Sequence, residues 1–279
     1  MLWVDLIKSF LIGIIQGITE WLPVSSTAHM LLFNEFLSLS LPSYFSDLFF
    51  TLIQLASILA VIVIYFEKLY PFSKKIGREE RQAKLKLWQR VCVGSIPVAV
   101  IGFIFDPLIE KLFYSDNGKA TETGVFVIAV SLIFYGVLFI FLERKRKTQN
   151  TEITTKKAFC IGLFQSLAIV PGTSRSGSTI LGARLFGVPR KESAEFSFFL
   201  AIPAMLGAAA YKLLKLFLSG TTLTSVECLI LLVGGVSAFA VSMTVIEFLT
   251  GFLKKHTFVP FGVYRIILGA VILIILIFR

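Results

Sequence analysis

Charged side chains are scarce in this chain. Asp, Glu, Lys and Arg make up only 16% of its 279 residues, whereas 56% of the residues are hydrophobic. A soluble domain is usually about a quarter charged, so the composition excludes a soluble protein and predicts a membrane protein. Cysteine is also scarce, and Cys92, Cys160 and Cys228 lie in apolar runs without paired spacing. This pattern excludes a small disulfide scaffold.

The basic residues give a net charge of +10, which in a soluble protein would suggest a nucleic-acid partner. Here Lys and Arg gather in short loops between apolar runs, at 67–90, 143–157 and 251–258. Positive charge of this kind marks the cytoplasmic loops of membrane proteins. We therefore expect no nucleic-acid partner, these loops in the cytoplasm and both chain ends outside.

Six segments have the apolarity and the length of roughly 20 residues that a membrane span needs. We predict spans at 46–66, 88–108, 122–142, 194–216, 227–250 and 258–278. Two more apolar segments, 6–38 and 157–188, are each interrupted by a run of polar residues, Pro and Gly. Irregular backbone at membrane depth is tolerated only inside protein or beside water. Both segments are therefore predicted to be re-entrant helix-loop-helix hairpins.

The two halves of the chain resemble each other. Gly13 and Gln16 recur as Gly162 and Gln165, and Pro23 and Ser26 recur as Pro171 and Ser174 with one residue deleted between the two pairs. Each half has a hairpin and three spans, and an odd number of crossings inverts the second half. We predict an all-α integral membrane protein with one domain, 1–279, built as an inverted-topology repeat of 1–145 and 156–279. The site of such folds lies near the midplane, where the broken helices meet.

The break in the first hairpin gathers polar side chains: Gln16, Glu20, Ser25, Ser26, Thr27 and His29. Gln16 and Glu20 are four residues apart and share a helix face. A charge at membrane depth costs roughly 2.5–3.5 kcal/mol on insertion scales, so we expect a function for Glu20. The alternatives are that Glu20 satisfies backbone donors at the interface and that His29 is structural.

The break in the second hairpin contains Gly172, Thr173, Ser174, Arg175, Ser176, Gly177, Ser178 and Thr179. Glycines let backbone N–H groups turn toward an anion, hydroxyls add donors, and Arg175 offers a planar fork for phosphate oxygens. This pattern predicts a phosphate cradle, the alternative being a plain Gly/Ser linker. The spacing of a Walker loop is absent, which argues against nucleotide hydrolysis.

A carboxylate, an imidazole and hydroxyls opposite an anion cradle suit phosphoryl chemistry on a phosphate carried by a lipid. Glu20, with Gln16, offers oxygen ligands to a hard divalent cation, Mg²⁺ or Ca²⁺, which would share the substrate's phosphate oxygens. We expect such a cofactor.

Both motifs together closely resemble the undecaprenyl-diphosphate phosphatase family, also called bacitracin resistance proteins. The resemblance implies a multi-pass enzyme of the bacterial plasma (inner) membrane that hydrolyses undecaprenyl diphosphate to undecaprenyl phosphate and inorganic phosphate. It would recycle the lipid carrier for peptidoglycan synthesis at an active site facing outward. The sequence leaves open whether the chain forms a homodimer.

The resemblance also implies roles for individual residues. The family motifs fall on Gln16, Glu20, Ser25, Ser26, His29 and residues 171–177, with Arg175 as phosphate clamp. We expect Glu20, Ser26, His29 and Arg175 to be catalytic. We expect the phosphate to be bound by Gln16, Ser25, Thr27, Gly172, Ser174, Ser176, Gly177 and Thr179. Gln16 stands where the family pattern also allows Glu, which leaves one carboxylate for a metal. The nucleophile stays open between Ser26, His29 and water activated by Glu20. Glu195 is a weaker candidate and reads better as a helix-end residue.

Two rival functions remain. Opposed hairpins in an inverted repeat are also a transporter architecture, so the chain would alternatively be a lipid-phosphate transporter or flippase. Anion binding needs the cradle but not Glu20, so Glu20→Gln would spare transport and stop hydrolysis. A structural scaffold would leave the polar breaks unexplained.

Overall fold

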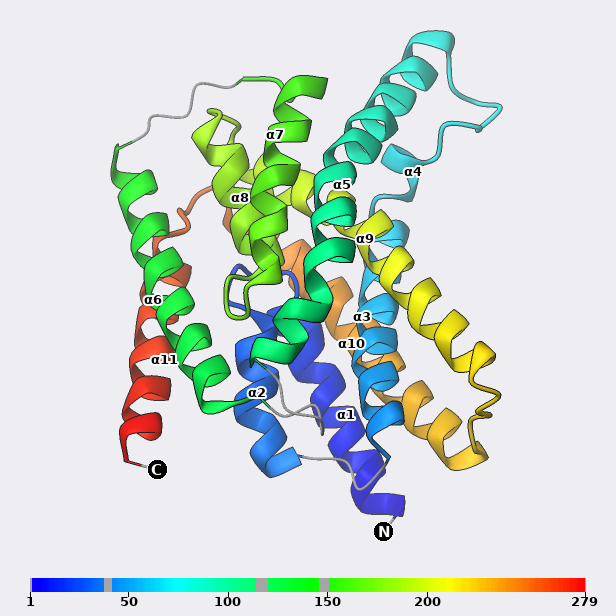
Figure 1. Ribbon diagram of the computed structural model, residues 1–279. Helices are drawn as coiled ribbons and strands as arrows, with labels where there is room; N and C mark the ends of the chain where they lie inside the picture. The colour runs from blue at the N-terminus through cyan, green and yellow to red at the C-terminus, as the bar shows by residue number, and fades with distance from the viewer. Residues whose placement is uncertain (1, 38–41, 114–119, 146–150, 279) are drawn as a thin grey trace.

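The computed structural model describes residues 2–37, 42–113, 120–145 and 151–278. The predicted first hairpin and second basic loop include residues 38 and 146–150, which lie outside this part of the chain, as does residue 279. Its helices are α1 (Leu2–Thr19), α2 (Ser26–Leu37), α3 (Ser43–Ile64), α4 (Phe66–Leu69), α5 (Arg78–Phe113), α6 (Glu122–Lys145), α7 (Thr155–Ser166), η1 (Leu167–Ile169), α8 (Arg175–Leu185), α9 (Arg190–Leu218), α10 (Ser225–Phe252) and α11 (Val259–Ile277). No strand occurs in the described ranges, which confirms the all-α prediction (Figure 1).

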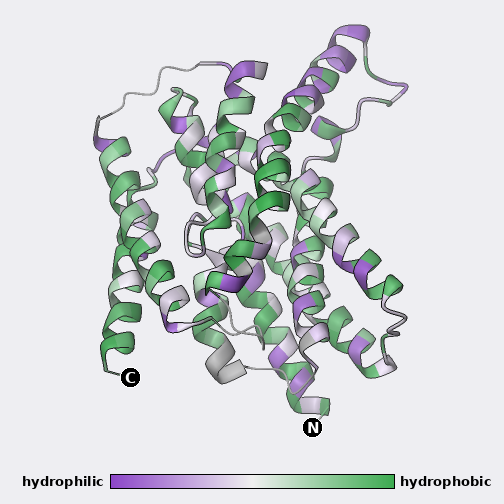
Figure 2. Ribbon diagram, in the orientation of Figure 1, coloured by the Kyte–Doolittle hydropathy of each residue, from purple (hydrophilic) through white to green (hydrophobic). Residues whose placement is uncertain are grey.

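Seven of these helices are long and apolar enough to cross a membrane: α1, α3, α5, α6, α9, α10 and α11. Their predominantly hydrophobic residues are visible in Figure 2, and the prediction of a multi-pass membrane protein is confirmed. The number is one higher than the six predicted spans. The additional helix is α1, the first arm of the predicted hairpin, because the polar break begins only after Thr19.

The helix α5 begins well before the predicted start at 88. The charged stretch from Arg78 to Arg90 continues the helix beyond its apolar part, and Figures 1 and 2 show this hydrophilic end projecting from the bundle. The loop that carries much of the basic charge is therefore largely helical.

Two helical hairpins enter the bundle from opposite ends (Figure 1). The pair α1 and α2 comes from the end where α1 begins and α11 ends, and the pair α7 and α8 comes from the other. Their turns meet about midway, where Ser176 Oγ donates a hydrogen bond to the Leu22 carbonyl oxygen at 3.2 Å. The fold thus places the two polar breaks of the sequence next to each other.

Corresponding helices of the two halves make corresponding contacts. The helix α1 packs against α10 as α7 packs against α5, while α3 pairs with α9 and α6 with α11. Small residues allow the first two contacts, since a Cβ on Gly13 would clash with Ser237 Oγ and a Cβ on Gly162 would clash with the Gly94 carbonyl oxygen. An inverted-topology repeat would produce this correspondence between the contacts of the two halves.

The substitution Gly162→Ala is expected to destabilise the protein. A backbone oxygen cannot rotate away from the new Cβ, so α7 and α5 must separate, and overpacking of this kind costs roughly 1–3 kcal/mol. Thermal unfolding of the purified protein in detergent measures the effect. The matched control is Gly207→Ala in α9, where no atom lies within 4 Å of the added Cβ and alanine favours the helix. Equal melting temperatures for the two variants would contradict the packing argument.

Candidate functional site

The two turns share an unusual backbone feature. Ser25, with φ 73°, and Ser174, with φ 74°, are the non-glycine residues with positive φ in the described chain. Each directly precedes the second helix of its hairpin, and each Oγ accepts a hydrogen bond from a backbone N–H three residues later, of Ala28 and Gly177 respectively. The structure thus places Ser25, and not Ser26 as the sequence comparison predicts, at the position equivalent to Ser174.

An ion pair joins the two hairpins at their turns. The Arg175 guanidinium donates to Glu20 Oε1 at 3.0 Å and to the Ser197 carbonyl oxygen at 3.1 Å. The second carboxylate oxygen of Glu20 accepts from Gln16 Nε2 at 2.8 Å. The side chains of Glu20 and Arg175 are only 6% and 15% exposed, so little water screens the charges. The predicted opposition of the carboxylate and the anion cradle is a direct contact.

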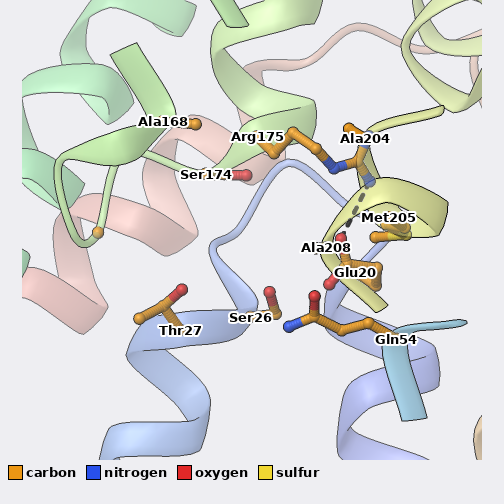
Figure 3. Close-up of a pocket in the computed structure, with 11 residues that line it drawn as sticks. Glu20, Ser26, Thr27, Gln54, Ala168, Ser174, Arg175, Ala204, Met205 and Ala208 are labelled. Carbon is orange, nitrogen blue, oxygen red and sulfur yellow. Dashed lines mark hydrogen bonds and ion pairs between the residues drawn. The ribbon is translucent and has the colours of Figure 1, made fainter. Parts of the chain in front are cut away.

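A cavity of about 210 Å³ lies beside this ion pair (Figure 3). From the two hairpins it is lined by the predicted site residues Glu20, Ser26, Thr27, Gly172, Ser174 and Arg175, and by Ala168. The other walls come from Gln54 of α3 and from Ala204, Met205 and Ala208 of α9. One side of the cavity is therefore polar and the side formed by α9 is apolar, as a phosphate attached to a hydrocarbon chain requires.

Other predicted residues lie behind this lining. Gln16 is buried and reaches the cavity only through Glu20. Ser176 Oγ lies 3.2 Å from Ser174 Oγ, and Thr179 Oγ1 donates to the Arg175 carbonyl oxygen at 2.7 Å. Ser25 and Gly177 form the cap interactions described above. Through these hydrogen bonds the residues behind the lining keep the residues that line the cavity in place.

The imidazole of His29 does not line the cavity. Its Nδ1 lies 2.7 Å from the Ser25 carbonyl oxygen and its Nε2 lies 2.6 Å from Tyr264 Oη. A carbonyl only accepts, so Nδ1 carries the proton, and in the neutral imidazole Nε2 then accepts from the tyrosine hydroxyl.

Removal of the Tyr264 hydroxyl is expected to slow any reaction that depends on His29. A hydrogen bond of this kind contributes about 0.5–1.5 kcal/mol, so Tyr264→Phe is expected to lower kcat by about 2- to 10-fold. The measurement is steady-state kinetics of the purified variant. The control is Tyr211→Phe on α9, whose ring is exposed. Equal kcat in both variants would show that the bond has no part in the reaction.

Glu195 lies outside the cavity lining. It forms ion pairs with Lys68 and Lys191 near the start of α9. The position of Glu195 near the start of α9 agrees with the interpretation that it is a helix-end residue.

Three polar residues near the turns were not among the predicted site residues. Gln54 is an uncharged polar residue within an apolar span, and Arg265 is the one charge in the last span. Tyr264 precedes it and resembles many aromatic residues of the chain. Their isolated position within apolar segments could have marked Gln54 and Arg265 as candidate site residues. Only the fold shows that α3 and α11 reach the hairpin turns.

Comparison with known proteins matches the chain over nearly its full length. A family model described as "Bacitracin resistance protein BacA" matches residues 9–271, which include both hairpin turns. Undecaprenyl-diphosphatase 1 of Clostridioides difficile (strain 630) is 49% identical over 273 residues, covering 96% of this chain and 95% of the relative. The undecaprenyl-diphosphatase of Enterococcus faecalis is 46% identical over 281 residues, covering 98% of each chain.

Proposed function

Since the chain belongs to the bacitracin resistance protein BacA family, we propose that it is a membrane hydrolase that converts undecaprenyl diphosphate to undecaprenyl phosphate and inorganic phosphate. The curated relatives carry the name undecaprenyl-diphosphatase. In this role the protein recycles the lipid carrier for peptidoglycan synthesis and confers the bacitracin resistance after which the family is named. The observation that carries the proposal for this site is the Glu20–Arg175 ion pair beside a cavity with one apolar wall.

The terminal phosphate would bind at the start of α8. Arg175 offers a bidentate fork, and the first backbone N–H groups of α8 lie at the positive end of the helix dipole. A phosphate that enters the cavity competes with Glu20 for Arg175. Binding of the substrate would therefore release the Glu20 carboxylate from its ion pair and leave it free to accept a proton.

Hydrolysis then breaks the bond between the bridging oxygen and the terminal phosphorus. We propose Glu20 as the base that takes the proton of the attacking group, which is Ser26 Oγ or a water molecule, since both Glu20 and Ser26 line the cavity. Undecaprenyl phosphate leaves with the bridging oxygen. If water attacks, inorganic phosphate forms directly; if Ser26 attacks, a phosphoserine forms, and a water molecule then hydrolyses it to release inorganic phosphate and restore the hydroxyl. His29 would act from behind the turn, through its bond to the Ser25 carbonyl oxygen.

The test of this proposal is release of inorganic phosphate from a polyprenyl diphosphate by the purified protein in detergent. Undecaprenyl phosphate serves as the control substrate, because it lacks the anhydride bond and should release no phosphate. Release from the diphosphate alone is the expected result. A folded, monodisperse protein that releases none would overturn the proposal.

We further propose that the protein lies in the bacterial plasma membrane, with the hairpin α1–α2 re-entrant from the outer face, α7–α8 re-entrant from the cytoplasmic face and the cavity open outward. The position of the basic charge supports this orientation. The basic segment 67–90 lies at the end of the bundle opposite the start of α1 (Figure 1), and positive loops face the cytoplasm. A homodimer stays a prediction. Labelling of single cysteines with a membrane-impermeant reagent in intact cells tests the orientation.

A divalent cation, Mg²⁺ or Ca²⁺, is proposed as cofactor. The side chains of Glu20 and Gln16 supply oxygen ligands, but no group of three or more His, Cys, Asp or Glu side chains able to hold a metal occurs in the described ranges. This set fits a cation held largely by the diphosphate oxygens and by one carboxylate. When bound, the cation would neutralise charge on the phosphates. Glu20, with Gln16 behind it, would hold the cation through one carboxylate oxygen and would take the proton on the other.

Removal of divalent cations is therefore expected to lower phosphate release by at least about tenfold. The measurement compares the wild type in EDTA with the same sample after addition of excess Mg²⁺ or Ca²⁺, which should restore activity. Because the cation is carried by the substrate, its apparent affinity should rise with substrate concentration. Unchanged release in EDTA would remove the cofactor from the proposal and leave the hydrolysis itself standing.

A further inference from the structure

A buried arginine of the last helix contacts both hairpin turns. Arg265 of α11 is 0% exposed. Its guanidinium donates to the carbonyl oxygen of Pro23 in the first turn at 3.1 Å. In the second turn it donates to the carbonyl oxygens of Gly172 and Thr173, each at 2.9 Å. One side chain thus spans the junction between the two halves of the site.

The charge of Arg265 is compensated by dipoles rather than by an acid. None of the ion pairs between described residues includes Arg265. The three carbonyl groups and the face of the Tyr135 ring, 5.7 Å from the guanidinium carbon, surround it instead. Burial of a charge without a counter-ion is unfavourable. The positive potential of Arg265 is therefore available to an anion that binds near the turns.

The hydrogen bond to Thr173 also fixes the peptide group that follows. In a trans peptide the C=O and N–H bonds point in opposite directions. Because the Thr173 carbonyl points toward Arg265, the N–H of Ser174 points away from it. Ser174 lines the cavity and has a positive φ, which non-glycine residues adopt only when the surrounding structure holds them there.

The same guanidinium supports the first turn. Pro23 lies two residues before Ser25, the other non-glycine residue with positive φ in the described ranges. Gly177 leaves room for the arrangement, since a Cβ at that position would lie 3.1 Å from Ser174 Cβ and 3.2 Å from Arg265 Nη1.

We propose that Arg265 is a positioning residue for the phosphatase reaction. It holds the two turns in register, directs the Ser174 N–H toward the bound terminal phosphate, and adds positive charge that no carboxylate neutralises near the bound phosphate. This inference rests on the proposed function, and it assigns to Arg265 no contact with the substrate.

The test compares conservative variants of two buried arginines. Lysine retains the charge, but a single ammonium group cannot reproduce a fork that reaches three carbonyls. We expect Arg265→Lys to lower kcat by about 10- to 100-fold and Arg265→Met by at least about 100-fold. The control is Arg184→Lys, because Arg184 is also buried in the second hairpin and donates to a carbonyl oxygen, that of Val188, while its ion-pair partner is Glu143 of α6. It is expected to stay within about twofold of the wild type.

Two further measurements separate positioning from folding. The folded fraction of each variant, from size-exclusion chromatography and thermal unfolding, corrects kcat to folded protein. The inhibition constant of inorganic phosphate should rise at least about tenfold in Arg265→Met and stay unchanged in Arg184→Lys. If Arg265→Met does not fold, Arg265→Lys decides.

The possible failures are distinguishable. An active wild type together with Arg265 variants that keep kcat and phosphate inhibition per folded molecule would overturn the positioning role and leave the phosphatase intact. An inactive, folded wild type would overturn the proposed function, and the positioning role with it.

Discussion

Glu20→Gln is expected to reduce phosphate release by at least about a thousandfold. The amide has nearly the same shape as the carboxylate and can still accept a hydrogen bond from Gln16 Nε2, so the first turn should keep its structure. It cannot act as a base, and general base catalysis contributes about 10²–10⁴-fold. The measurement is kcat of the purified variant, with melting temperature as the check on folding.

A second buried carboxylate provides the control for this variant. Glu227 is 3% exposed, and it caps α10 by accepting from the Thr224 backbone N–H at 2.7 Å, far from the cavity lining. Glu227→Gln is expected to lose stability but to keep kcat per folded molecule. Full turnover by Glu20→Gln would show that Glu20 is not the base. The transporter would be favoured instead if the wild type hydrolysed no diphosphate and Glu20→Gln moved lipid phosphate across liposome membranes.

Arg175→Lys is expected to lower kcat/KM by about 10²- to 10³-fold. Lysine retains the positive charge, so Glu20 keeps a counter-ion. The planar fork that serves both Glu20 and the Ser197 carbonyl oxygen in the free enzyme is lost, and with it bidentate binding of the phosphate. Initial rates over a range of substrate concentrations measure the effect, and the inhibition constant of inorganic phosphate should rise in parallel.

The control for Arg175→Lys is Arg190→Lys. Arg190 forms a comparable ion pair with Glu143, but neither residue lines the cavity. We expect its kcat/KM to stay within about twofold of the wild type. If Arg175→Lys were as active as this control, a positive charge alone would suffice at position 175, and the clamp would not be bidentate.

Local sequence patterns predicted most of the fold. Long apolar runs indicate spans whatever their neighbours are, and the polar breaks marked the two turns. The first arm of the first hairpin was harder to classify, because residues 2–19 have the length and apolarity of a membrane span. They differ from a span only in that the chain turns back after them. The pairing of the helices depends on contacts between distant segments, of which the sequence carries a trace only in residues such as Gly162.

The candidate site was predictable where its residues lie in the two motifs. Glu20, Ser26 and Arg175 do line one cavity. The orientation of His29 was not predictable, because it is set by Tyr264, which is distant in sequence. The same holds for Arg265: a charge in a span indicates a function, but its partners are backbone carbonyls, and carbonyls have no signature in a sequence.

The contacts of α11 have a consequence for the biogenesis of the protein. This helix follows both hairpins in the chain, yet it supplies the side chain that binds both turns. A nascent chain that has inserted both hairpins into the membrane therefore has an unfinished site until α11 has been synthesised and packed against the turns.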